Sequence, residues 1–386
     1  MLEDDSPTAL DAQAGGQTEW SFEYGASCRL DLETGSSDPA IRVRGEVAVG
    51  LDPEGVVVDG TTNRAYVACS RSGSVAVVDL EKLERIGEIA VGQEPIDIVL
   101  DPVSRRAFTA DARSNQVSVI DLDVGEVTAT IPVGAYPAGL AIDVERRRLY
   151  CGDTMGSTLS IVDVDRLERL GTVEAELGAG AVDVDRARNV AYCVNFVTGS
   201  VTVADLEAME AVDRIVVGEG PCAAVVVPDR DEVFVVNSLA GTIARIGLDD
   251  HRVREELPVP NAPVGITAAP SGDRIYVANR GDGSMSVLGC DGLEWARVAV
   301  GAAPGGVIVH PEDPRIVLVA NAGTGSITVV EDDLTGPPAS RVEAIEHPLV
   351  GRPLPEFALP DLHTGALRHQ VEWAEKKYIL NFFASW

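Results

Sequence analysis

The chain repeats one pattern of residues seven times at an interval of 42. A large aromatic or aliphatic residue returns at Tyr66, Phe108, Tyr150, Tyr192, Phe234, Tyr276 and Leu318. Three residues later a mostly polar position returns as Cys69, Asp111, Asp153, Asn195, Asn237, Asn279 and Asn321. A turn position precedes each aromatic, and it is filled by Pro53, Pro95, Pro137, Ala179, Pro221, Pro263 and Pro304. A period of this length is typical of β-propeller blades (about 40–45 residues) or of helical HEAT-type pairs (about 40–47 residues).

The residues inside each repeat favour strands over helices. β-branched runs such as Gly55–Asp59, Ala65–Ala68 and Ser74–Asp79 are separated by Gly, Pro, Asn and Asp, with turn signals every ~8–12 residues, which is a strand-and-turn pattern. No window carries an apolar stripe at helical spacing long enough for a pair of helices. The sequence therefore predicts an all-β fold, a seven-bladed β-propeller of 42-residue, four-stranded blades over residues 41–333.

Each predicted blade runs from its innermost strand outwards. The innermost strand follows the proline turn, the second carries the aromatic residue, the third ends in Asp, and the fourth leads to the next turn. Proline fixes φ at the entry to the innermost strand. A glycine precedes the turn at positions 50, 92, 134, 218 and 301, and we expect it to adopt φ values that other residues resist.

The two ends of the repeat region predict how the ring closes. The seventh copy ends after its third strand, at residues 326–331, while a spare strand at residues 41–49 precedes the first copy. We expect residues 41–49 to complete the last blade. Residues 341–345 are the alternative occupant of that position.

The repeat resembles the YVTN family of bacterial and archaeal β-propellers. Shared features are Val-Gly-x-x-Pro, Tyr-Val-x-Asn, a Gly-Ser-Val strand and a terminal Asp, and the resemblance covers residues 41 to about 332. Proteins with this blade include surface-layer proteins, lactonase-like enzymes and subunits of quinoprotein dehydrogenases. The resemblance therefore implies the fold and leaves the activity open, because one fold carries many functions.

Charge and hydropathy exclude several functions. The formal net charge is −30, so nucleic acid is not an expected partner, since phosphate binding needs a basic face. The sequence has no run of ~18 apolar residues, so no membrane-spanning helix is predicted. The acidic segment 1–40 is expected to be partly disordered. It lacks the features of a signal peptide, which points to the cytoplasm, whereas the family resemblance points outside it.

Cysteine and histidine usage predicts neither a disulfide nor a metal site. None of the six cysteines forms a Cys-x-x-Cys pair. Cys151 and Cys193 occupy the same strand position in successive blades and should point the same way, which argues against a disulfide between them. Buried, unreactive thiols are the expected state. The repeats contain two isolated histidines, His251 and His310, so we predict no metal and no cofactor.

The mouth of the central channel is the predicted binding site. Loops converge on the face that carries the proline turns and the loops after the aromatic strands. The candidates there are Arg71, Arg113, Arg280, Glu219, Asn261 and Cys222. They would bind a small molecule or a protein, although solvated surface residues are the alternative interpretation. The recurring Asn and Asp positions are expected to be structural, because such side chains bond nearby backbone.

The composition changes after Asp333. Residues 334–349 form a predicted linker rich in turn-forming residues. Residues 350–386 then resemble the opening of redoxin domains, which include the alkyl hydroperoxide reductase/thiol-specific antioxidant family and thioredoxin-like thiol–disulfide oxidoreductases. The similarity runs through Gly351 to Leu362, a turn at His363 to Gly365, a helical turn at Val371 to Glu375 and a strand at Tyr378 to Trp386.

The redoxin resemblance implies chemistry that lies beyond Trp386. In thioredoxin-like members the Phe-Ala-Ser-Trp pattern is followed by Cys-x-x-Cys, whose thiolate attacks a disulfide or a peroxide from a helix N-terminus. The chain supplies neither that cysteine nor the helix, so it has no catalytic residue of its own. We interpret it as the front part of a thiol-dependent oxidoreductase or antioxidant protein, whose propeller recognises a thiol or disulfide protein partner. The alternatives are a non-catalytic binding propeller and a lactonase-like or quinoprotein-like propeller enzyme.

Overall fold

The computed structural model describes residues 36–259, 261–337, 358–360 and 367–369. The chain forms two compact units, residues 1–336 and 337–386. In the second unit, β29 (Ala358–Pro360) pairs antiparallel with β30 (Leu367–His369). The predicted turn at His363 to Gly365 lies outside the described residues. The helical turn and strand predicted after residue 370, and the alternative closing strand 341–345, lie outside the described residues.

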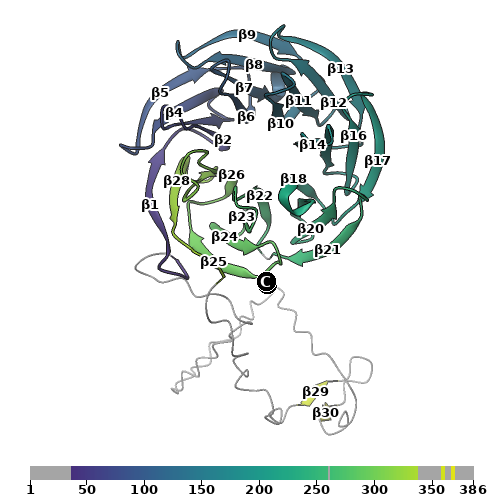
Figure 1. Ribbon diagram of the computed structural model, residues 1–386. Helices are drawn as coiled ribbons and strands as arrows, with labels where there is room; N and C mark the ends of the chain where they lie inside the picture. Colours follow the sequence, from purple (N-terminus) through teal and green to yellow (C-terminus); the bar gives the residue numbers. More distant parts are fainter. Residues whose placement is uncertain (1–35, 260, 338–357, 361–366, 370–386) are drawn as a thin grey trace, which may run out of the picture. The chain divides into compact units, whose positions relative to one another are not determined.

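The first unit is a propeller of seven four-stranded antiparallel sheets, counted over its described residues (Figure 1). Blade 1 comprises β2 (Pro53–Asp59), β3 (Arg64–Cys69), β4 (Ser74–Asp79) and β5 (Glu84–Ala90). Blade 2 comprises β6 (Pro95–Asp101), β7 (Arg106–Asp111), β8 (Gln116–Asp121) and β9 (Glu126–Pro132). Blade 3 comprises β10 (Pro137–Asp143), β11 (Arg148–Asp153), β12 (Thr158–Asp163) and β13 (Glu168–Glu174). Blade 4 comprises β14 (Ala179–Asp185), β15 (Val190–Asn195), β16 (Ser200–Asp205) and β17 (Glu210–Val216).

The remaining blades follow the same order from the inside outwards. Blade 5 comprises β18 (Pro221–Val227), β19 (Glu232–Asn237), β20 (Thr242–Gly247) and β21 (Val253–Pro258). Blade 6 comprises β22 (Pro263–Ala268), β23 (Arg274–Asn279), β24 (Ser284–Gly289) and β25 (Glu294–Ala299). Blade 7 comprises β26 (Pro304–Val309), β27 (Ile316–Asn321), β28 (Ser326–Asp332) and β1 (Ile41–Ala48). Two short 3₁₀ turns, η1 (Ala112–Ser114) and η2 (Pro228–Arg230), stand in loops. The predicted seven-bladed, all-β architecture is confirmed.

The ring closes as the ends of the repeat region predicted. β1 pairs antiparallel with β28, in a register that sets Ile41 opposite Asp332 and Ala48 opposite Ser326. Ile41, Val47 and Val49 are buried. An ion pair of 2.9 Å between Arg42 and Glu331 joins the two strands. The first strand therefore supplies the outer strand of the last blade (Figure 1).

The hydrophobic core lies between the blades rather than inside any one of them. Among the described residues, each of the seven junctions between neighbouring blades holds one cluster of buried apolar side chains. The repeated aromatic residue sits in these clusters, as in Tyr66, Phe108 and Tyr276, each at most 2% exposed. Fully burying such a side chain contributes ~1.5–3 kcal/mol, so each blade depends on its neighbours for stability.

The glycines before the proline turns have a different role from the one expected. Their φ angles are not positive; the residue just before the turn proline has positive φ instead, as in Asp52, Glu94 and Tyr136, all at 57°. The glycines are needed because of space. A Cβ at Gly50 would lie 2.9 Å from Cys69 Sγ, and one at Gly218 would lie 2.7 Å from Asn237 Nδ2. The prediction that these glycines adopt φ values that other residues resist was therefore wrong. They make room for the side chain at the repeated, mostly polar position.

The recurring Asn and Asp positions are structural, as predicted, although their partners are not those expected. Asn195 Nδ2 donates to the hydroxyls of Ser200 and Thr202, at 3.1 and 2.9 Å. Asp153 accepts hydrogen bonds from the Thr158 and Ser160 hydroxyls, at 2.9 and 2.7 Å, and from a glycine N–H. These side chains tie the second strand of a blade to the third.

Candidate functional site

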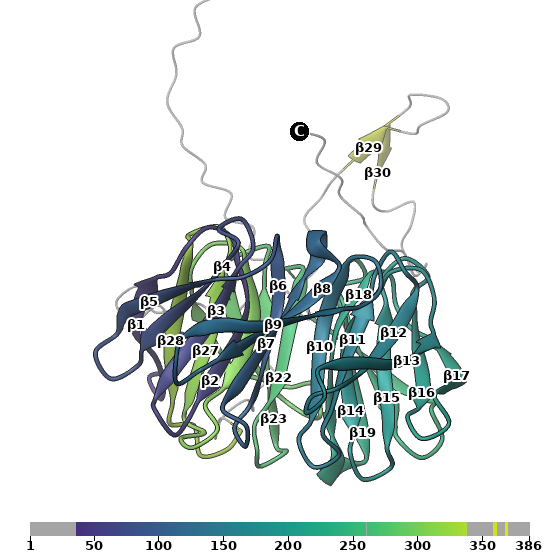
Figure 2. The ribbon, with the colours of Figure 1, turned by 90° about the horizontal axis from the view of Figure 1, so that it is seen from above.

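The mouth face is formed by two kinds of loop that are bonded to each other. One is the turn before each innermost strand, and the other joins the second and third strands of the same blade (Figure 2). Backbone hydrogen bonds join them, including Ser70 N to Asp52 O at 2.9 Å and Ser238 N to Gly220 O at 2.9 Å. The loops of this face are therefore fixed relative to the blades.

One ion pair crosses the mouth between blades that are not neighbours. Arg280, in the loop after β23 of blade 6, donates to both carboxylate oxygens of Glu54 in β2 of blade 1, at 3.1 and 3.2 Å. Blade 7 lies between them and carries Gly305 at the position where blade 1 has Glu54. A Cβ at Gly305 would lie 3.0 Å from a Glu54 carboxylate oxygen. The glycine thus leaves the space through which the pair forms.

The Glu54 carboxylate is held in a poorly solvated position. Burial raises its pKa above the ordinary value, and the neighbouring Asp52 acts in the same direction, while Arg280 lowers it. A charged pair whose acid is partly desolvated is the kind of group that binds polar ligands or exchanges partners at a functional site.

Cys222 lies in the wall of the channel within the electrostatic field of Arg280. Its thiol donates to Val264 O at 3.4 Å. Burial raises the pKa of this thiol to about 12, and the nearby Arg280 guanidinium opposes that shift only in part. Cys222 is therefore protonated at neutral pH, and it acts as a small apolar group rather than as a nucleophile.

Arg71 and Arg113 each pair with an acid in the turn before the innermost strand of the same blade. Arg71 pairs with Asp52 at 3.4 Å and is 79% exposed. Arg113 is paired with Glu94, which also accepts the Tyr136 hydroxyl at 2.5 Å and so connects blades 2 and 3.

The last two predicted residues lie at blades 5 and 6. Asn261 donates to Asp282 at 2.8 Å. Glu219 is exposed, and its carboxylate makes no hydrogen bond or ion pair with another described residue. Among the described residues, no hydrogen bond or ion pair joins any two of the six predicted residues; the Arg280 charge only acts on the pKa of the Cys222 thiol.

Sequence reasoning missed three carboxylates of the innermost strands: Glu54, described above, Asp97 and Asp183. Asp97 accepts the backbone N–H of Ile98 and, from the next blade, that of Leu140, both at 2.8 Å. Asp183 accepts the N–H of Val184 and that of Val226 in the next blade, again at 2.8 Å. Burial raises the pKa of both groups, that of Asp97 to about 6.

The repeat alignment contained a signal for all three acids. The six positions equivalent to Asp183 hold Val57, Val99, Ala141, Val225, Thr267 and Ile308. The six positions equivalent to Glu54 hold Ile96, Ala138, Gly180, Cys222, Val264 and Gly305. The six equivalent to Asp97 hold Gly55, Gly139, Ala181, Ala223, Gly265 and Gly306. A lone acid in an otherwise apolar or small column marks a departure from the common blade.

The cysteines of the propeller are unpaired in the described structure, as predicted for Cys151 and Cys193. Burial raises the pKa of Cys193 to about 12 and that of Cys151 well above its ordinary value. No group of three or more potential metal ligands occurs among the described residues.

The face opposite the mouth carries buried aspartates that bind arginines of the next blade. Arg105 donates to Asp59, and Arg147 to Asp101, both at 2.6 Å. We call each such pair a latch. Hydrogen bonds from Thr61, Thr62 and Arg105 overcome the effect of burial and lower the pKa of Asp59 to about 2.

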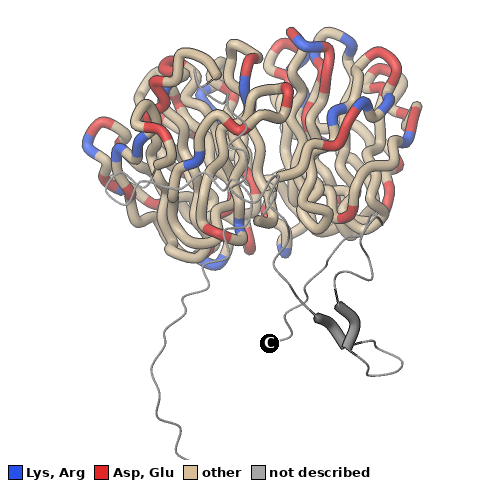
Figure 3. The backbone as a smooth tube through the Cα atoms, turned by 90° about the horizontal axis from the view of Figure 1, so that it is seen from below, with Lys and Arg blue, Asp and Glu red and all other residues tan. Residues whose placement is uncertain are grey.

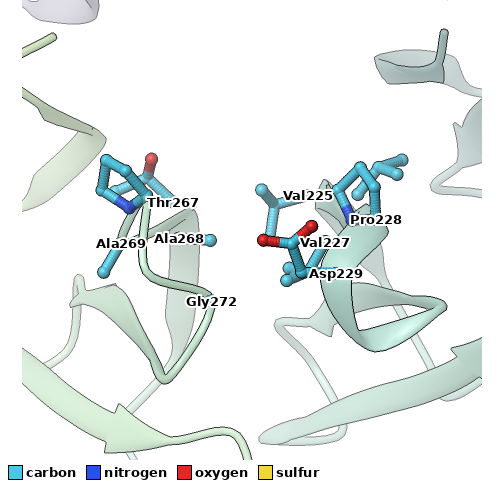
Figure 4. Close-up of a pocket in the computed structure, with 10 residues that line it drawn as sticks. Val225, Val227, Pro228, Asp229, Thr267, Ala268, Ala269 and Gly272 are labelled. Atoms are coloured by element: carbon cyan, nitrogen blue, oxygen red, sulfur yellow. The ribbon is translucent and has the colours of Figure 1, made fainter.

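Two cavities lie at junctions that have no latch. One, of about 270 Å³, lies between blades 3 and 4, where Asn189 replaces the latch arginine. The other, of about 220 Å³, lies between blades 5 and 6, where Val227 replaces the latch aspartate. Figure 4 shows Val225 and Asp229 facing Thr267 and Ala268 across the second cavity. Neither cavity is lined by a residue predicted from the sequence.

Charged residues cover the propeller on both faces, with Asp and Glu more frequent than Lys and Arg (Figure 3). Within the described ranges, no helix has the length and apolar character needed to cross a bilayer.

Comparison with known proteins identifies the fold. The chain is similar to "Kuenenia stuttgartiensis Hydrazine Synthase" in a solved structure, with a TM-score of 0.63 and 20% identity over 72% of this chain and 95% of that one. At this identity the likeness concerns the fold alone. The comparison with curated proteins gives no match. A family model described as a YNCE-like beta-propeller matches residues 46–315, more than half of the chain. The chain therefore belongs to the family of YNCE-like β-propellers.

Proposed function

We propose that this propeller is the recognition module of a thiol-dependent redox protein, with its binding site at the channel mouth. The observation that carries the recognition role is the Arg280–Glu54 pair, which spans blade 7 above Gly305. Both members are available to a ligand: Arg280 offers donors for an anion, and Glu54 is a partly desolvated acceptor. A ligand that separates the pair would gain two charge-assisted hydrogen bonds.

The redox role rests on the sequence of residues 350–386 and their resemblance to the opening of redoxin domains. The described thiols of the propeller do not supply such chemistry, because burial raises the pKa of Cys69, Cys151, Cys193, Cys222 and Cys290. In this proposal the reactive cysteine is the one that the redoxin resemblance places after the Phe-Ala-Ser-Trp pattern. The second candidate function is a propeller that binds its partner without catalysis. The protonated state of the described thiols favours it, because a protonated thiol is a poor nucleophile.

The test compares two disulfide substrates with the full-length gene product. The reduced protein is mixed with insulin, a protein disulfide, and with dithiobis(nitrobenzoate), a small disulfide. We expect Arg280→Ala to slow the reaction with insulin by about tenfold, equivalent to ~1.4 kcal/mol, and to leave the small disulfide unaffected. Arg71→Ala is the matched control, because Arg71 lies on the same face and is 79% exposed.

The two parts of the proposal fail separately. If neither disulfide reacts with the full-length protein, the redox role is wrong and the binding-only candidate replaces it. If both substrates react and Arg280→Ala behaves like Arg71→Ala, the mouth pair is not the recognition site.

A further inference from the structure

An apolar sector occupies one side of the mouth face. The tip of the loop between the second and third strands is the same repeat position in every blade. From blade 1 to blade 7 that position holds Arg71, Arg113, Met155, Val197, Leu239, Gly281 and Gly323. The three consecutive apolar tips, those of blades 3, 4 and 5, are 72%, 67% and 70% exposed.

Two further apolar side chains extend this surface. Leu177, in the turn before β14, is 59% exposed, and Phe196, beside Val197, is 44% exposed. Val197 N donates to Leu177 O at 3.2 Å, so these residues are neighbours. Leu239 lies against Gly220, which is in the turn before the innermost strand of the same blade. A Cβ on Gly220 would lie 2.5 Å from Leu239 Cγ. We call Met155, Leu177, Phe196, Val197 and Leu239 the apolar rim.

The backbone of the apolar rim is already ordered. Met155 N donates to Ala135 O at 3.0 Å, and Phe196 N donates to Gly178 O at 3.0 Å. Because the loops are fixed, a partner that covers these side chains restricts their rotamers but need not order the backbone. Contiguous exposed apolar patches mark interaction sites.

Charge indicates which partner fits. The chain carries a formal charge of −30, so a second copy would be repelled at long range, whereas a cationic partner would be attracted. At the edge of the apolar rim, Glu219 is exposed, and its carboxylate has no partner among the described residues. It lies in the turn bonded to the Leu239 loop, because Ala240 N donates to Glu219 O at 3.1 Å.

We propose that the apolar rim of blades 3–5 docks a polypeptide segment that has apolar side chains flanked by lysine or arginine, with Glu219 binding one of the cationic groups. This surface is separate from the Arg280–Glu54 pair and does not depend on the redox role. Met155, Val197 and Leu239 are the anchors, since they are the most exposed and occupy equivalent positions in three adjacent blades.

The test measures binding of a fluorescent short peptide of leucine, phenylalanine and valine flanked by lysines, and of a sister peptide with glutamates in place of the lysines. The triple variant Met155→Ser/Val197→Ser/Leu239→Ser should bind the lysine peptide at least ~tenfold more weakly than the wild type. Its matched control is Val103→Ser/Val124→Ser/Leu293→Ser, which alters equally exposed side chains (72%, 65% and 56%) in turns of the opposite face.

Further arms separate the apolar contribution from the ionic one. Glu219→Gln should weaken the lysine peptide by about threefold, an effect that added salt removes, and should leave the weak binding of the glutamate peptide unchanged. Equal loss in the triple variant and its control would overturn the proposal. The proposal would also be overturned if the wild type bound no peptide and the triple variant lost a different property. That property would be self-association, measured by light scattering, or binding to zwitterionic vesicles.

Discussion

Aspartates of the innermost strands are held in two opposite states by their surroundings. Asp59 and Asp101, at the strand ends away from the mouth, bind arginines, and hydrogen bonds lower their pKa values despite burial. Asp97 and Asp183, farther up the strands, have no cation as hydrogen-bond partner and accept backbone N–H groups only, so burial raises their pKa values. The surroundings therefore stabilise the ionised form of an aspartate in one place and destabilise it in the other.

The two states predict a stability maximum in mildly acidic solution. Asp97 has a pKa of about 6 in the folded protein against an ordinary value of 3.8. Its favourable contribution is complete below pH ~4 and is lost as the pH rises through about 6, a loss of up to about 3 kcal/mol. Asp59 acts oppositely, because its pKa is about 2 when folded: its contribution is present above pH ~4 and is lost towards pH 2. Urea unfolding at a series of pH values should therefore give the highest free energy of unfolding near pH 4, with a fall of up to about 3 kcal/mol between pH 4 and about 6–7 from Asp97 and a fall below pH 4 from Asp59.

Asp97→Ala separates this effect from the general relief of negative charge. The variant leaves the Leu140 N–H without its partner and is less stable at every pH. The difference in its free energy of unfolding between pH 5 and pH 8 should nevertheless be smaller than that of the wild type. An unchanged difference would show that Asp97 does not titrate in this range.

The strands that face each other across a junction depend on latches as well as on apolar contact. Arg147 connects Asp101 of blade 2 with Asp165 of its own blade 3, at 2.6 and 2.8 Å. Asp101 is fully buried, and a buried charge that loses its partner is costly. The arrangement is not general, because Asn189, Asp231 and Asn63 stand at the position of the latch arginine in blades 4, 5 and 1.

Arg147→Ala should destabilise the propeller by about 3 kcal/mol, because it leaves the Asp101 carboxylate without its cation. The midpoint of chemical unfolding measures the effect. The control is Arg166→Ala, which removes an exposed pair with Glu168 at 3.7 Å and should cost less than about 0.5 kcal/mol. If the two variants lost equal stability, the latches would be no more than surface ion pairs.

The 42-residue pattern was sufficient to predict the strands, the order of the blades and the closing strand, because each depends on residues that recur. It was insufficient wherever the molecule departs from the repeat. Glu54 and Arg280 are 226 residues apart, and their contact requires a glycine in a third blade, which no periodicity encodes. The glycine before each turn was misinterpreted because φ freedom and small volume favour the same residue. Arg71, Arg113 and Arg280 lie in loops after second strands, and the repeat gave no indication that their partners are Asp52, Glu94 and Glu54.

The whole propeller is held shut by pairing between its first and last strands. β1 covers β28 along its length and buries Ile41, Val47 and Val49. Without β1, the third strand of blade 7 would become an exposed edge, which is a template for association with other chains. The ends of the repeat region are thus the elements on which ring integrity depends.

Deleting residues 1–49 should lower the free energy of unfolding by about 6 kcal/mol, counting ~2 kcal/mol for each of the three buried side chains. The truncated protein should also elute as oligomers in size-exclusion chromatography. Deleting residues 1–35, which precede the described segment, is the control and should change neither property. A monomeric protein of unchanged stability after the longer deletion would mean that β1 is dispensable for closure.

Pairing of β1 with β28 also determines when the ring can close during synthesis of the chain. Arg42 of β1 donates to Asp333, the residue after β28, which lies 291 residues further along the chain. At ~5–20 residues per second, the ribosome needs roughly 15 to 60 s to make the intervening chain. During that interval six blades can form in order of synthesis, while β1 has no strand to join. Completion of the ring is therefore the last event of propeller folding, and its timing is set by translation.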